Sequence, residues 1–189
     1  MRRFSVRPPI TLKGRQFKGI RGWAGKPAHP PLTDIPIGAY ALGGAFDVVS
    51  VIGGDDHSWG RDFWHAATYV FVAGAVVSVL AALTGLFDWL RSSEPGTQAR
   101  RTVNTHATIM LTVTALVLLD IALRIGGYDS KASTPLGIMI LSVVIALLVS
   151  LGATYGGSLV FDHGFNVETA RDSPVWHKSE DDLLPGDEH

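Results

Sequence analysis

The stretch AATYVFVAGAVVSVLAALTGLF, residues 66–87, decides the fold because it holds no charged side chain. About 20 consecutive apolar residues are enough for a helix to cross the hydrocarbon layer of a membrane. The predicted span that contains this stretch runs from about residue 63 to residue 90. Three more apolar stretches predict spans at about 35–54, 102–125 and 135–161. The short polar segments between the spans force neighbouring helices to run antiparallel. We therefore predict an all-α membrane protein, a four-helix transmembrane bundle in up-down order.

The overall composition agrees with a membrane protein and excludes several classes of function. Only 17% of the 189 residues are charged and 47% are hydrophobic, whereas a soluble domain carries about 25% charged residues. The absence of cysteine excludes disulfides, iron–sulfur ligation and thiol catalysis. A net charge of −1 argues against nucleic acid as a partner. The sequence has no glycine-rich phosphate loop and no GxSxG, HExxH or CxxCH motif, which disfavours ATPases, hydrolytic enzymes and c-type cytochromes.

The distribution of basic residues predicts the orientation of the bundle. Residues 1–28 form a basic N-terminal arm with eight Lys or Arg, residues 29–163 hold the bundle, and residues 164–189 form a polar C-terminal tail. Up-down order places the arm and the tail on one side, together with Arg91, Arg100, Arg101, Arg171 and Lys178, and leaves Arg61, Arg124 and Lys131 on the other. Because the cytoplasmic segments of a membrane protein carry an excess of Lys and Arg, we expect both termini on the cytoplasmic side of a bacterial inner membrane. The arm is predicted to contact anionic lipid or to dock a partner protein.

Three histidines and one aspartate are predicted to lie on this cytoplasmic side, each at the end of a different span. They are His29, in the segment before the first span, Asp88, His106 and His163. Polar residues at membrane depth are costly and are usually functional. Histidine with aspartate suits a transition-metal ion, whereas two facing histidines suit a b-type haem. For haem we predict His106 and His163 as the ligands, with Arg91, Arg100 and Arg101 near the propionates; ordinary helix caps and turns remain the alternative for each residue.

A second set of polar residues lies near the opposite side and contains Asp47, His57, His65 and Asp120. Asp120 and Arg124 are four residues apart on one helix and can form an ion pair. Asp47 is expected near the same depth, so we predict a buried ion network of these three residues. A redox or proton site that uses His65 is the alternative, and would make the bundle a transmembrane electron conduit. Trp64 and Trp89 stand at the ends of the second span, where tryptophan is typically an interfacial anchor.

Four segments carry a resemblance to a known family. They are HPPLTDIPIGAYALGGAFD (29–47), LAALTGLFDW (80–89), NTHA (104–107) and YGGSLVFDHGFNV (155–167). The chain resembles the bacterial family known as domain of unknown function 2231, which implies four spans and no established activity. Some relatives resemble fusions to Rieske-type iron–sulfur domains, which implies electron transfer; here the redox partner would be a separate protein. The resemblance marks His29, Asp47, Asp88, His106 and His163 as family-type positions without assigning them roles.

These observations favour an integral membrane redox subunit that binds haem b or a transition-metal ion near the cytoplasmic face. The alternative is a structural or accessory subunit of a larger membrane complex with no cofactor of its own. A small transporter ranks third, because four spans are few for a pathway and the later three lack a charge near the membrane midplane. Among these readings, the sequence favours an electron-transfer or accessory subunit over a stand-alone enzyme.

Overall fold

The computed structural model describes residue 20 and residues 27–167, and within them the chain forms four long helices. They are α1 (His29–Gly53), α2 (Ser58–Ser92), α3 (Gln98–Ile125) and α4 (Leu136–Phe161). Each helix is long and apolar enough to cross a membrane. The predicted four-helix membrane bundle is therefore confirmed.

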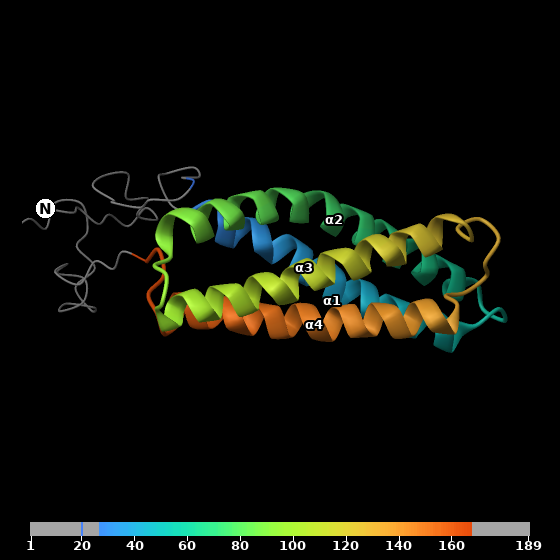
Figure 1. The fold of residues 1–189 in the computed structure, drawn as a ribbon. Helices are drawn as coiled ribbons and strands as arrows, with labels where there is room; N and C mark the ends of the chain where they lie inside the picture. The colour runs from blue at the N-terminus through green and yellow to red at the C-terminus, as the bar shows by residue number, and fades with distance from the viewer. Residues whose placement is uncertain (1–19, 21–26, 168–189) are drawn as a thin grey trace, which may run out of the picture.

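The helices run side by side in up-down order (Figure 1). The start of α1, the end of α2, the start of α3 and the end of α4 lie together at one end of the bundle, which we name end A; the opposite end is end B. Helices α1 and α3 each pack against both α2 and α4. Consequently α1 and α3 face each other diagonally across the bundle, and α2 and α4 form the other diagonal.

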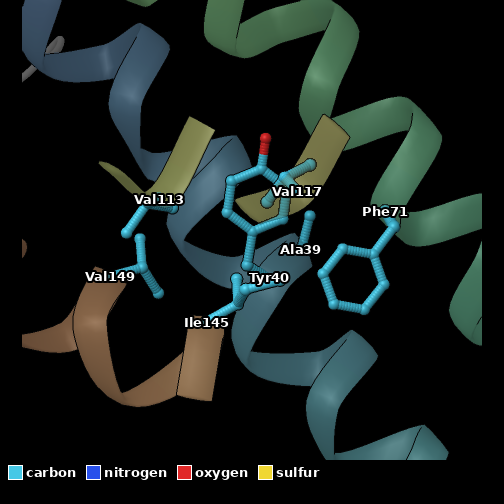
Figure 2. Packing of buried hydrophobic residues seen from close by; sticks show 7 residues of the cluster. All are labelled: Ala39, Tyr40, Phe71, Val113, Val117, Ile145 and Val149. Atoms are coloured by element: carbon cyan, nitrogen blue, oxygen red, sulfur yellow. The ribbon is translucent and has the colours of Figure 1, made fainter. Parts of the chain in front are cut away.

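The core is built from small and branched side chains together with two aromatic rings. Figure 2 shows that they converge from all four helices: Ala39 and Tyr40 (α1), Phe71 (α2), Val113 and Val117 (α3), and Ile145 and Val149 (α4). The outer faces carry large exposed apolar side chains such as Leu83, Leu118 and Leu147. An apolar exterior of this kind suits lipid tails rather than water.

Helix α1 begins earlier than the span predicted near residue 35. It starts at His29, directly followed by Pro30 and Pro31 in its first turn. Proline is tolerated there because the first N–H groups of a helix have no partner within it. The prediction that His29 lies in a segment before the first helix was therefore wrong, because His29 is the first residue of α1. The arm predicted over 1–28 and the tail predicted over 164–189 lie largely outside the described residues.

Candidate functional site

The four residues that the sequence predicts to share one side of the membrane all lie at end A. His29 is the first residue of α1, Asp88 lies in the last turns of α2, His106 lies in the third turn of α3, and His163 lies two residues beyond the end of α4. Their shared end, predicted from up-down order, is confirmed. Whether they contact one another depends on where each side chain points.

The structure brings two of them together, His29 and His106. Their ring centres are 6.4 Å apart and their planes meet at 84°. Because the rings come from α1 and α3, they meet across the diagonal of the bundle. With metal–nitrogen bonds of about 2.0 Å, two imidazoles on opposite sides of one metal ion have ring centres roughly 6 Å apart. The observed spacing matches that arrangement.

Backbone hydrogen bonds fix the orientation of both rings. His29 Nδ1 lies 2.9 Å from the carbonyl oxygen of Ala81, and His106 Nδ1 lies 2.8 Å from that of Gly152. A carbonyl oxygen only accepts, so each Nδ1 carries the proton and donates it. In the neutral ring, Nε2 then keeps its free lone pair, which is the usual arrangement of a histidine that binds a metal.

Each ring also packs against a glycine of a neighbouring helix. A Cβ atom on Gly85 of α2 would lie 2.7 Å from His29 Cε1, and one on Gly156 of α4 would lie 3.2 Å from His106 Cε1. The first distance is too short for any side chain without moving the ring. Both glycines lie in segments that resemble the known family, but the sequence alone did not show that they make room for the histidines.

The other two members of the set point elsewhere. His163 is exposed, and its Nε2 lies 3.3 Å from Thr102 Oγ1. Asp88 is buried, and its Oδ1 has no hydrogen-bond partner. Among residue 20 and residues 27–167, no three histidine, aspartate or glutamate side chains are grouped as metal ligands. The structure thus pairs His106 with His29 rather than with His163, and it does not gather the four predicted metal ligands His29, Asp88, His106 and His163 around one point.

The three arginines expected near haem propionates differ in their surroundings. Arg100 Nη1 donates to the carbonyl oxygens of Trp89 and Ser93 at 3.1 and 3.3 Å, and its guanidinium lies 4.2 Å from the centre of the Trp89 ring. Arg100 therefore closes the turn between α2 and α3. Arg91 is exposed over the Phe87 ring, and Arg101 is exposed at the start of α3.

The ion network predicted near the opposite side is confirmed at end B. Arg124 forms salt bridges with Asp47 of α1 and with Asp120 of its own helix, and none of the three side chains is exposed. Arg124 also donates to Thr68 of α2 at 3.4 Å, and Thr134 donates to Asp47 at 2.8 Å. The cluster therefore joins three helices and the segment before α4.

Two aromatic rings enclose the guanidinium of this cluster. Arg124 lies 4.9 Å from the centre of the Trp64 ring and 4.8 Å from that of Phe71. Trp64 is fully buried, so its prediction as an interfacial anchor was wrong. Aromatic faces attract a desolvated cation, and the arginine accounts for the burial of Trp64. The positions of the charged residues in the sequence do not indicate this role of Trp64.

His57 contacts the end of α1 and His65 contacts the α3–α4 connection, so neither histidine at end B contacts the ion cluster. His57 Nδ1 lies 3.1 Å from the carbonyl oxygen of Gly53, while His65 stacks on Tyr128 and its Nε2 lies 3.1 Å from the Tyr128 carbonyl oxygen. The hydrogen bond that Tyr128 donates to Tyr69 raises the pKa of Tyr128 to about 12, because losing the proton would break that bond. These contacts tie the α3–α4 connection to α2.

Comparison with known proteins identifies one family. The family described as "Predicted membrane protein (DUF2231)" matches residues 25–169. This range includes both histidines of the pair and the whole ion cluster. Neither a curated protein nor a solved structure matches the chain.

Proposed function

Because this chain belongs to the DUF2231 family of predicted membrane proteins, we propose that it is a redox protein of the membrane that binds one b-type haem between His29 and His106. The observation that carries the proposal is the pair of rings, 6.4 Å apart, each with Nδ1 at a backbone carbonyl. A bound haem b supplies a one-electron couple of its iron. His29 and His106 would hold its iron from two helices that face each other across the bundle, a common design in helix bundles.

A haem suits this pair better than a bare metal ion does. A transition-metal ion in a protein takes three or four protein ligands, and the described residues hold no such group. A haem already brings four nitrogens to its iron, so two histidines are sufficient. Arg91 and Arg101 are the exposed cations of end A nearest in sequence to the α2–α3 turn, and we assign them to the propionates; Arg100 is engaged with Trp89 and Ser93.

The absorption spectrum of the purified protein tests this proposal. After expression with sufficient haem supply, we expect a Soret band in the oxidised protein that shifts on reduction, at about one haem per chain. Elemental analysis for iron, zinc, copper and manganese serves as the control for a bare metal ion. A stoichiometric metal without a Soret band would refute the haem, and absence of both would favour the accessory subunit.

The accessory subunit remains a second candidate for a specific reason. Both histidine rings already have backbone partners, and the ion cluster at end B is satisfied within the bundle. Polar residues of this kind can hold helices together without any cofactor. Such a subunit would copurify with other membrane proteins at a fixed ratio, and replacement of both histidines would leave that ratio unchanged.

We also propose that end A faces the cytoplasm of a bacterial inner membrane. Thirteen of the sixteen Lys and Arg residues belong to end A or to the chain beyond it, which is the charge bias typical of a cytoplasmic side. In this orientation the haem lies where a cytoplasmic redox partner can reach it. The basic arm is the segment we assign to that contact.

Single cysteines provide the test of orientation, because the chain contains none of its own. Asp56 lies exposed in the α1–α2 loop at end B, and Glu94 lies exposed in the α2–α3 turn at end A. We expect a membrane-impermeant maleimide to label Asp56→Cys in intact spheroplasts, and to label Glu94→Cys only after the membrane is opened. Labelling in the reverse pattern would place end A outside.

A further inference from the structure

Asp88 is a buried carboxylate whose charge lacks a partner among the described residues. It is 5% exposed, and its Oδ1 is buried without any hydrogen bond. The backbone N–H of Ile20 bonds to the carboxylate, but no ion pair among the described residues includes Asp88. An isolated charge in such a place is costly. A polar atom left in this state calls for an explanation.

Asp88 shares a face of α2 with the residues that contact His29. Ala81 accepts from His29 Nδ1, Thr84 Oγ1 lies 3.4 Å from the same atom, and Gly85 packs against the ring. Residues three or four apart lie above one another on a helix, so the same face continues through Asp88 to Ser92. Ser92 Oγ is also buried without a partner. Two buried oxygen atoms without a hydrogen-bond partner, Asp88 Oδ1 and Ser92 Oγ, therefore lie between the histidine pair and the end of the helix.

The charged and titratable side chains at end A come from every helix. They are His29 and Asp34 on α1, Arg91 on α2, Glu94 in the α2–α3 turn, Arg100, Arg101 and His106 on α3, Tyr155 on α4, and Asp162 and His163 after α4. Arg91 lies over Phe87, and Arg100 is bound to Trp89 and Ser93. The two histidines use their ring protons on backbone carbonyls. None of these groups supplies Oδ1 of Asp88 with a proton in the structure.

We propose that Asp88 takes up one proton when the haem iron between His29 and His106 accepts one electron. This rests on the proposed haem. The electron comes from a separate one-electron donor protein and reduces ferric to ferrous iron. The proton comes from water at end A, passes by Ser92 Oγ, and forms the O–H bond of a neutral carboxylic acid at Asp88. The negative charge added by the electron is then cancelled by the proton on Asp88, so the net charge inside end A does not change. A low-dielectric interior strongly favours such compensation.

The pH dependence of the haem midpoint potential tests this proposal. If one proton is taken up with each electron, the midpoint potential falls by up to about 59 mV for each unit that the pH rises. One pH unit is a tenfold change in proton concentration, and a tenfold change corresponds to about 59 mV for a one-electron couple. We expect such a slope in the natural protein and a midpoint potential that does not change with pH in Asp88→Asn. Because asparagine resembles the protonated carboxyl group, the potential of Asp88→Asn should equal that of the natural protein at low pH. Asp162→Asn, which removes an exposed carboxylate at the same end, is the matched control and should keep the slope.

The possible failures are distinguishable. Absence of a Soret band would refute the haem and this inference with it, whereas a Soret band with an unchanged slope in Asp88→Asn would refute only the inference. If Asp88→Asn does not fold, the infrared difference spectrum of the natural protein decides. Reduction should produce a carboxylic acid carbonyl band that shifts when aspartate is isotopically labelled, and its absence would overturn the proposal.

Discussion

Arg124→Met is expected to destabilise the folded bundle by about 3–5 kcal/mol, because it leaves two buried carboxylates without their shared cation. The guanidinium is the only described cation in contact with Asp47 and Asp120, and all three side chains are fully buried. The change also removes the donor to Thr68 and the cation between Trp64 and Phe71. Unfolding in detergent, followed by circular dichroism against increasing denaturant, would measure the loss.

Two further variants separate the charge from the packing. Arg61→Met removes an exposed arginine of end B, whose only described bond is to the carbonyl oxygen of Asp129, and should cost less than about 1 kcal/mol. Adding Asp47→Asn and Asp120→Asn to Arg124→Met should restore much of the stability, since replacing a whole buried ion cluster by neutral groups is often tolerated. If Arg124→Met were as stable as Arg61→Met, the cluster would not hold the bundle.

The second large effect is expected at the histidine pair. His29→Ala and His106→Ala should each lower haem affinity by more than about 100-fold. Changing a residue that only supports a metal ligand already lowers affinity by about 10–100-fold, and these two changes remove a ligand itself. Each change removes one of only two axial nitrogens. His163→Ala should leave the affinity unchanged, because His163 is exposed and contacts Thr102. Titration of the apoprotein with haemin, followed at the Soret band, provides the measurement.

The same three variants distinguish between the two possible ligand pairs. Loss of haem in His163→Ala with retention in His29→Ala would support the pair predicted from the sequence, His106 and His163. The expected result supports the pair that the structure brings together. Circular dichroism of each variant should show the same helix content, so that a lost Soret band reflects a lost ligand rather than an unfolded bundle.

Several features of this protein could be predicted from the sequence for clear physical reasons. The uncharged stretches fix four spans because hydrocarbon excludes charge, and short connections fix up-down order. The i,i+4 spacing of Asp120 and Arg124 predicts a pair on one helix, and the depth of Asp47 predicts the third member. Trp64 was misread, because its position along α2 indicates a membrane interface whereas the direction of its side chain, toward Arg124, is not encoded in that position.

Sequence alone determined that His29, Asp88, His106 and His163 share one end of the bundle, because up-down order fixes which helix ends lie together. It did not determine which of them meet. That depends on the rotation of each helix about its axis and on which helices are diagonal, and both are set by the packing of the core between α1, α2, α3 and α4. Only the tertiary structure placed His29 in the first turn of α1, directed its ring across the bundle to His106 at 6.4 Å, and left His163 at the surface.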